Sequence, residues 1–263
     1  MYICKKNIMN KTLITLTFLL SSILLPIKTL AWGKQGHALV AEVAFKYMDK
    51  KTKKIVLQYL DGMTIEDAAN WMDEVKKDHS YDYMSAYHYA NFELGATVEE
   101  KEVANIIYQL DSTIKALQNK NNLTPAEINT KIKILFHLMG DLHQPLHVGY
   151  GNDKGGNTMQ VNYNSKGTNL HALWDFGIIE SKNIGLHNCL KVTKYSKKEI
   201  MSLQEINVVN WAKDSRSYLL PIYNTDGNKI SDKYVDSSVS IIENQILKAG
   251  IRLAGVLNVV FKN

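Results

Sequence analysis

The sequence predicts a mainly α protein, and three observations support this prediction. Apolar residues recur at helical spacing in segments between residues 37 and 261. Thr64, and Thr124 followed by Pro125, are residues that typically start helices. The stretch 149–169 differs, because it is rich in Gly and Asn around a short alternating run. We therefore expect a single helical domain over residues 32–263 with one small β-hairpin in the 149–169 loop.

The first helices follow from their periodicity and caps. Residues 37–48 have apolar side chains at helical spacing, and residues 97–119 give a further helix. In the segment 64–76, Thr64 is the expected N-cap, and Asp67 stands at the third helical position. His88 lies in the run AYHYANF (86–92), for which we expect a short extended backbone.

The later elements follow in the same way. A helix begins at Pro125 and ends before Pro145, which cannot continue it. The run MQVNY lies inside 149–169 and predicts the hairpin strand. A short helix follows over 171–175, and the last long helix spans about 232–261 with one apolar stripe.

Residues 1–31 have the pattern of a secretory signal peptide. Three lysines precede an apolar run over 13–27, and Thr29 and Ala31 stand at the −3 and −1 positions of a small-residue cleavage site. The alternative is a membrane anchor, but the run is short for a span of about 20 residues, and Pro26 interrupts its end. We predict cleavage after Ala31, a secreted or periplasmic protein, and no membrane span after cleavage.

Charge and cysteine content narrow the functional classes. The net charge is +5, and residues 1–31 hold four lysines and no acid, so the processed chain carries only +1. A strong basic surface for sequence-independent nucleic-acid binding is therefore excluded, and attraction for phosphate must come from bound metal.

Cys189 is the only cysteine after residue 31, so no intramolecular disulfide is expected, and no motif suggests a nucleophile.

The segment FHLMGDLHQPLH (136–147) is the strongest functional signal. His137 and Asp141 are four residues apart on a helix and share one face, and His171 and Asp175 repeat this spacing. Imidazole and carboxylate ligands together suit zinc, which predicts a multi-zinc enzyme.

Three of the eight histidines are not assigned to this group of potential metal ligands. We assign ordinary structural roles, and no function, to His79, His143 and His187, with the alternative that His143 holds a metal ligand through its ring N–H.

Six ordered motifs between residues 32 and 175 resemble the zinc-dependent single-strand nuclease and 3′-nucleotidase family, typified by the fungal nucleases called S-one and P-one. They are WGKQGH (32–37), NWMDEVK (70–76), HYANF (88–92), HLMGDLHQPLH (137–147), GGN (155–157) and NLHALWD (169–175). The resemblance implies a helical fold of the zinc phospholipase C and P-one nuclease type that holds three Zn²⁺ ions.

The resemblance also implies a ligand for each zinc. One zinc would be held by Asp73, His88 and His137, and a second by His37 and by Trp32 through its free α-amine and carbonyl oxygen. Asp141 would bridge these two, and the third zinc would take His147, His171 and Asp175. An α-amine can ligate only if nothing precedes it, so signal cleavage would create a ligand.

The expected activity is endonucleolytic hydrolysis of single-stranded DNA and RNA to 5′-phosphorylated products, with 3′-nucleotides as further substrates. Three Zn²⁺, three carboxylates and one hydroxide leave a site of about +2, which attracts phosphate esters. Asp73 and Asp141 would organise the zinc pair beside the attacking water, and Lys76 would contact the reacting phosphate. The alternative for Lys76 is a solvated lysine. We expect the protein to act as a monomer.

Single-strand specificity requires a site for an unpaired base. The resemblance places a stacking aromatic at Tyr89, a base-edge partner at Asn91 and a further nucleotide contact at Asn157. The fungal enzymes carry Phe and Asp at the first two positions, so the base preference of this chain is open. The alternative for Tyr89 is packing in the core.

Two other functions remain as alternatives. A zinc phospholipase C acting on membrane phosphodiesters shares the helical three-zinc architecture, but HYANF, GGN and Lys76 match the nuclease branch better. The second is a non-catalytic secreted zinc-binding protein, although no expected ligand is missing.

Overall fold

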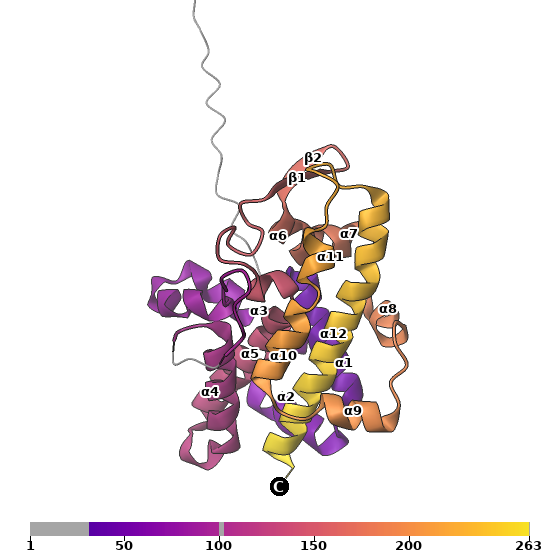
Figure 1. The fold of residues 1–263 in the computed structure, drawn as a ribbon. Helices are drawn as coiled ribbons and strands as arrows, with labels where there is room; N and C mark the ends of the chain where they lie inside the picture. Colours follow the sequence, from indigo (N-terminus) through magenta and orange to yellow (C-terminus); the bar gives the residue numbers. More distant parts are fainter. Residues whose placement is uncertain (1–31, 100–102, 263) are drawn as a thin grey trace, which may run out of the picture.

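The fold consists almost entirely of helices, which differ widely in length (Figure 1). The structure is a computed structural model and describes residues 32–99 and 103–262. The predicted signal peptide lies outside the described residues. The longer helices are α1 (Lys34–Tyr47), α2 (Lys50–Leu60), α3 (Ile65–Glu74), α4 (Ile106–Gln118), α5 (Pro125–Leu142) and α12 (Asp232–Phe261).

Shorter helices connect these elements along the second half of the chain. They are α6 (Leu170–Ala172), α7 (Ile178–Ser181), α8 (Leu186–Lys191), α9 (Lys197–Leu203), α10 (Val208–Arg216) and α11 (Leu219–Tyr223). Tight 3₁₀ turns cover Val75–Lys77, His79–His88, Lys120–Asn122 and Pro145–Val148, and a π-helical turn, Leu173–Gly177, joins α6 to α7.

The sheet is an antiparallel hairpin of β1 (Gln160–Tyr163) and β2 (Lys166–Asn169), which lies at the top of the view in Figure 1. Its register pairs Gln160 with Asn169 and Tyr163 with Lys166. Asn164 and Ser165 form the turn with positive φ angles, a conformation that tight hairpin turns require. The predicted hairpin in 149–169 is confirmed.

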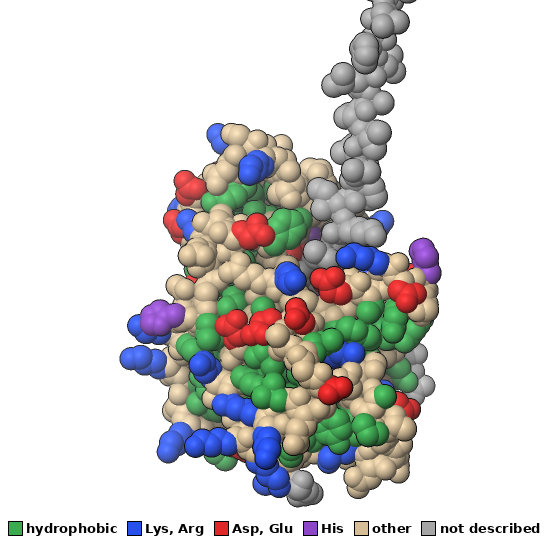
Figure 2. Space-filling model, turned by 180° about the vertical axis from the view of Figure 1, so that it is seen from behind, with side chains coloured by type: hydrophobic (Ala, Val, Ile, Leu, Met, Phe, Trp, Pro, Cys, Tyr) green, Lys and Arg blue, Asp and Glu red, His purple; other side chains and the backbone are tan. Residues whose placement is uncertain are grey.

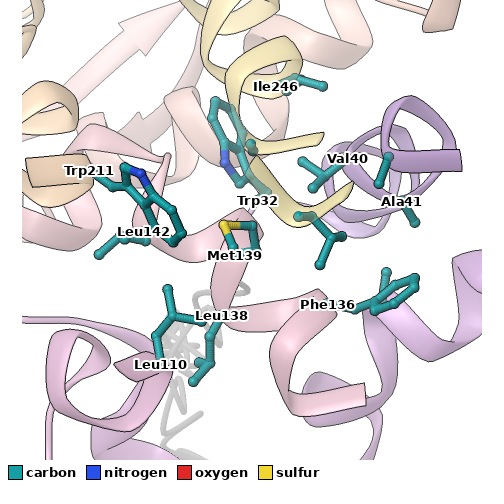
Figure 3. Close-up of a cluster of buried hydrophobic side chains, with 14 of the residues drawn as sticks. Trp32, Val40, Ala41, Leu110, Phe136, Leu138, Met139, Leu142, Trp211 and Ile246 are labelled. Carbon is teal, nitrogen blue, oxygen red and sulfur yellow. The ribbon is translucent and has the colours of Figure 1, made fainter. Parts of the chain in front are cut away.

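The core forms where α5 meets the N-terminal helices and α12. Helix α1 packs against α12 and α3, while α3 and α4 pack against α5. Trp32, Phe136 and Met139 are fully buried in one cluster, together with side chains from α1 and α12 (Figure 3). Burying a large apolar side chain contributes roughly 1.5–3 kcal/mol, so this cluster fixes α5 firmly.

The mainly α prediction is confirmed, and several predicted caps have the expected contacts. Thr64 accepts a hydrogen bond from the Asp67 backbone N–H, and Thr124 and Glu127 form a reciprocal capping box. The last helix, predicted over about 232–261, spans Asp232–Phe261. Among the described residues, no helix combines the length and the apolar character needed to cross a membrane.

Two predicted elements differ from the structure. The helix expected over 97–119 begins only at Ile106, because the Asn105 side chain accepts hydrogen bonds from the N–H groups of Ile107 and Tyr108 and so starts the helix there. His88 was expected in an extended run, but it ends the 3₁₀ turn, and the extended backbone begins at Tyr89.

Cys189 is buried, and burial raises the pKa of its thiol to about 12. The thiol is therefore protonated at neutral pH and not a nucleophile, as predicted.

Gly250 allows α12 to approach α1 closely. A Cβ atom at this position would lie 2.3 Å from Cγ1 of Val43 and 2.9 Å from the backbone nitrogen of Ala44. Gly250→Ala should therefore lower the free energy of unfolding. The crowding costs about 1–3 kcal/mol. This cost outweighs the gain of about 1 kcal/mol that replacing Gly by Ala gives inside a helix.

Urea unfolding measures this change, and a double-mutant cycle controls it. Val43→Gly removes the side chain whose Cγ1 and Cβ atoms lie 2.3 and 2.5 Å from a Cβ at Gly250, so the double variant should be more stable than the sum of the single changes predicts. Simple additivity would contradict the close contact.

Candidate metal centre

Helix α5 carries the central residues of the site into the interior. His137 and Asp141 are both fully buried, and their i, i+4 spacing brings Nε2 of His137 within 3.3 Å of Oδ2 of Asp141. Gly140 stands between them because a Cβ there would lie 2.6 Å from Nδ1 of His37. The glycine in the motif HLMGDLH therefore makes room for a histidine from α1.

The Asp141 carboxylate lies among four imidazoles from separate segments. Its Oδ1 is 3.2 Å from Nε2 of His37 and 3.8 Å from Nδ1 of His147, and its Oδ2 is 2.9 Å from Nδ1 of His88. The ring of His37 also stacks on that of His137 with centroids 3.9 Å apart. Segments from residue 37 to residue 147 thus converge on one carboxylate.

Backbone hydrogen bonds set the orientation of three of the histidines. Nδ1 of His137 is 2.8 Å from the Ala69 carbonyl oxygen, and Nδ1 of His147 is 2.7 Å from that of His88. Nδ1 of His171 is 2.7 Å from the carbonyl oxygen of Gly155. In each case Nδ1 donates the hydrogen bond, so that in the neutral ring Nε2 carries the lone pair, the arrangement typical of metal-binding histidines.

His147, His171 and Asp175 form a second part of the site. Nε2 of His171 is 3.3 Å from Oδ2 of Asp175, and Nε2 of His147 is 3.7 Å from Oδ1 of Asp175. Asp175 lies in the π-helical turn, a local widening that often occurs at functional sites. The three potential ligand atoms lie within 4.8 Å of one another.

Two further groups of three residues also have their potential ligand atoms within 4.8 Å of one another. One consists of His37, Asp73 and His137, and the other of His88, His137 and Asp141. His137 belongs to both, so these two groups form one continuous cluster. Asp73 is joined to it by Oδ1, which is 3.7 Å from Nε2 of His137.

The residues present fit a metal. Six buried nitrogen and oxygen atoms of these side chains make no hydrogen bond within the described residues: Nδ1 and Nε2 of His37, Nε2 of His88, Oδ1 of Asp141, Nε2 of His147 and Oδ2 of Asp175. Buried polar atoms without partners are costly, and ligation by a cation would satisfy them.

The negative charges of Asp141 and Asp175 favour a cation, either a proton or a metal ion, at His147. Burial alone lowers the pKa of His147, but the negative charges of Asp141 and Asp175 outweigh burial and raise it to about 9. Burial lowers the pKa of His88 to about 4, despite its contact with Asp141, so His88 is neutral and able to ligate.

A cleft of about 750 Å³ opens over these groups. His88, His147 and His171 line it together with Lys76, Ser85, Tyr89, Asn91, Leu146, Gly151, Lys154 and Asn157. Tyr89 is 45% exposed, Asn91 is also exposed, and Ala90 between them is buried, as expected for an extended run. The ammonium of Lys76 lies 2.6 Å from Oδ1 of Asp73.

All the histidines and aspartates that the sequence predicts as metal ligands belong to the three groups described above. Trp32 is buried in the core, and the N–H of the next residue, Gly33, donates to the carbonyl oxygen of Asp175 at 2.8 Å. His79 and His187 are exposed. His143, by contrast, does not lie on the surface, because its ring is fully buried and accepts a hydrogen bond from Arg252.

Gln144 is a positioning residue that the sequence reasoning missed. Its amide nitrogen donates to Oδ1 of Asp175 at 2.5 Å, and its amide oxygen accepts from the N–H of Leu146 at 2.6 Å. It therefore links Asp175 to the turn that carries His147. Its place beside Pro145 in the motif HQPLH was the available signal.

Arg216 was also missed. Its guanidinium donates to the carbonyl oxygens of Val148 and Gly149 and lies 4.4 Å from the centroid of the Phe92 ring. It thereby joins the segment after His147 to the segment after His88. No motif surrounds Arg216 in the sequence.

The helical fold and the clustered imidazoles and carboxylates define a metal-dependent hydrolase. A family model for S1/P1 nuclease matches residues 32–262. The chain belongs to this zinc-dependent family of nucleases, which hydrolyse the phosphodiester bonds of nucleic acids.

Curated relatives agree with this assignment. Endonuclease 2 of Arabidopsis thaliana is 29% identical over 269 residues, which cover 88% of this chain and 90% of the relative. Nuclease S1 of Aspergillus oryzae is 27% identical over 88% of this chain and 92% of its own. Nuclease P1 of Penicillium citrinum is 24% identical, with coverage of 86% and 97%.

Gln144→Ala should weaken metal binding by the group that contains Asp175. Loss of a hydrogen bond to a ligand of this kind typically costs about 10- to 100-fold in metal affinity. Competition with a chromogenic chelator measures the zinc that remains bound. Gln118→Ala, on the exposed end of α4, is the matched control. Wild-type zinc retention by Gln144→Ala would remove Gln144 from its positioning role.

Proposed function

We propose that the protein is a secreted or periplasmic zinc-dependent endonuclease. It hydrolyses single-stranded DNA and RNA to 5′-phosphorylated products and also acts on 3′-nucleotides. The observation that carries this proposal is the convergence of three His/Asp groups beneath one open cleft. The family supports the chemistry, and the exposed residues at the cleft support the choice of single strands.

The proposal divides the residues of the site among three Zn²⁺ ions in the way that the family resemblance implies. Asp73, His88 and His137 would hold one, His37 and the main chain of Trp32 a second, and His147, His171 and Asp175 a third. Asp141 would bridge the first two. Its contacts with His37, His88 and His137, between 2.9 and 3.3 Å, support this bridging position.

Zinc, when bound, supplies Lewis-acid polarisation of the phosphate and lowers the pKa of water. The protein supplies position and charge. Asp73 holds the Lys76 ammonium at 2.6 Å, and Lys76 lines the cleft, where it can stabilise the extra negative charge of the reacting phosphate. Asp73, Lys76 and Asp141 are thus the proposed catalytic residues.

Positive charge on metal bound in the cleft, and not on the protein surface, explains how a protein with little net charge attracts nucleic acid. On the face drawn in Figure 2, Lys and Arg side chains are mixed with Asp, Glu and hydrophobic side chains. Positive charge supplied by metal inside the cleft acts in a region partly shielded from solvent, where electrostatic interactions are stronger than at the surface.

Tyr89 and Asn91 are the proposed recognition residues for an unpaired base. An unstacked base gains about 1–3 kcal/mol on an aromatic face, and a paired base must be released from its helix first. Exposure of 45% favours this role of Tyr89 over packing in the core. Asn157 lies at the same cleft, where its amide nitrogen donates to the Lys154 carbonyl oxygen.

The zinc-loaded protein should cleave a single-stranded oligonucleotide about 10- to 100-fold faster than the same sequence in a duplex, the factor that the stacking energy allows. Gel analysis and phosphatase sensitivity of the ends identify 5′-phosphorylated products. Preferential hydrolysis of phosphatidylcholine vesicles would instead support a phospholipase, and hydrolysis of neither substrate would support a non-catalytic zinc protein.

Asp141→Asn should reduce the cleavage rate by at least about 100-fold and lower the zinc content, because the bridging ligand loses its charge. Metal analysis by mass spectrometry and initial rates test this prediction together. Asp226→Asn, an exposed residue, is the control. Unchanged zinc and rate in Asp141→Asn would count against the bridging assignment.

The N-terminus offers a separate test of processing. A protein that starts at Trp32 should bind the full complement of zinc, whereas one with a single preceding residue should lose one zinc and most activity. The physical reason is that an amide nitrogen is a far poorer ligand than a free amine. A chain extended by one residue at its C-terminus is the control, and full activity of the N-terminally extended protein would exclude Trp32 as a ligand.

A further inference from the structure

Lys154 has a backbone conformation that its residue type disfavours. Its φ angle is +54°, in the left-handed region where a Cβ atom meets the following carbonyl oxygen. The other non-glycine residues with positive φ among those described are Asp61, Asn164, Ser165 and Asn183. All four are short polar residues, so Lys154 is the one long side chain in this set.

The surrounding loop imposes this conformation. Gly155 and Gly156 follow with φ angles of +63° and +81°, and a Cβ at Gly155 would lie 2.2 Å from the Leu146 carbonyl oxygen. Asp153 fixes the start of the loop through its Oδ1, which accepts hydrogen bonds from the Gly156 N–H and the Tyr223 hydroxyl, both at 3.0 Å.

The backbone at position 154 would therefore accept Asn or Gly with less strain than Lys. A strained residue that persists beside an active site suggests that its side chain has a use there. Lys154 is exposed and lines the cleft. Within the described part of the chain, its ammonium has no hydrogen bond or ion pair, in contrast to Lys76, which is held by Asp73.

The two lysines stand at different ends of the metal-binding region. Lys76 contacts Asp73, which is joined through His137 to Asp141. The loop of Lys154 meets the other group, because the carbonyl oxygen of the next residue, Gly155, accepts a hydrogen bond from Nδ1 of His171. A single phosphate at the metals would have Lys76 beside it, so Lys154 is free to meet another part of the substrate.

We propose that Lys154 binds a phosphate next to the one that is cleaved, and so favours polynucleotides over substrates with a single phosphate. This inference rests on the proposed nuclease function and assigns it an additional substrate-contacting residue. An exposed ammonium that has no partner among the described residues suits a phosphate of a flexible strand, because such a contact needs charge and reach but no fixed geometry.

The test uses zinc-loaded protein and the variants Lys154→Asn and Lys154→Arg. Asn tolerates the left-handed backbone and removes the charge, whereas Arg keeps the charge. Binding of a phosphorothioate oligothymidylate, which resists hydrolysis, is followed by fluorescence anisotropy at several NaCl concentrations. Hydrolysis of thymidine 3′-(p-nitrophenyl phosphate) reports on a phosphodiester that has no neighbouring phosphate.

Lys154→Asn should bind the oligonucleotide about two- to fivefold more weakly at low salt, the range that exposed ion pairs contribute. The slope of log Kd against log salt should fall by about 0.7, the value for one phosphate contact on a single strand. Hydrolysis of the p-nitrophenyl ester should be unchanged, Lys154→Arg should restore binding, and the exposed-lysine control Lys166→Asn should resemble the wild type.

Three results would overturn the inference. An unchanged salt slope in Lys154→Asn would mean that Lys154 meets no phosphate. Equal losses on the oligonucleotide and on the p-nitrophenyl ester would place it on the reacting phosphate instead. If the wild-type protein neither binds nor cleaves any nucleic acid, the proposed function itself fails and this inference fails with it.

Discussion

The arrangement of the site follows from one buried negative charge, the carboxylate of Asp141. It is fully buried on α5, and four imidazoles lie within 3.8 Å of its two oxygens. A buried carboxylate is costly unless cations or hydrogen-bond donors surround it. The helices must therefore bring histidines from α1, from the turn before Tyr89 and from the turn after Gln144 to the same point. The close contact of α1 with α5 through Gly140 is one direct consequence.

Much of the fold could be predicted because helix signals are local. Thr64, the Thr124 capping box and the apolar stripe of α12 determine nearby hydrogen bonds or one face of one helix. The start of α4 was missed because the side chain of Asn105 caps the helix there, in competition with a favourable helical pattern further upstream. Helix boundaries of this kind depend on a single side-chain conformation, which periodicity does not report.

The candidate site was predictable to the extent that its residues follow a motif. The five clustered histidines and three aspartates were all named from spacing and family resemblance. Gln144 and Arg216 act through contacts between segments distant in the sequence, so their roles became visible only in three dimensions. His143 shows the same limit, because its burial depends on Arg252, which is 109 residues away in the chain.

The C-terminal third of the chain contains no metal-site motif, yet the site depends on it. Arg252 donates to Nε2 of His143 at 2.7 Å and to Asp214 at 2.9 Å, while Gln245 donates to the His143 carbonyl oxygen at 3.0 Å. Burial, and then the charge of Arg252, lower the pKa of His143 to about 3, so this histidine stays neutral and its Nε2 remains an acceptor. Helices α10 and α12 thus hold the end of α5 immediately after Asp141. A substitution in this network would disturb the ligands without touching them, and for this reason the site requires the helices that follow its last motif.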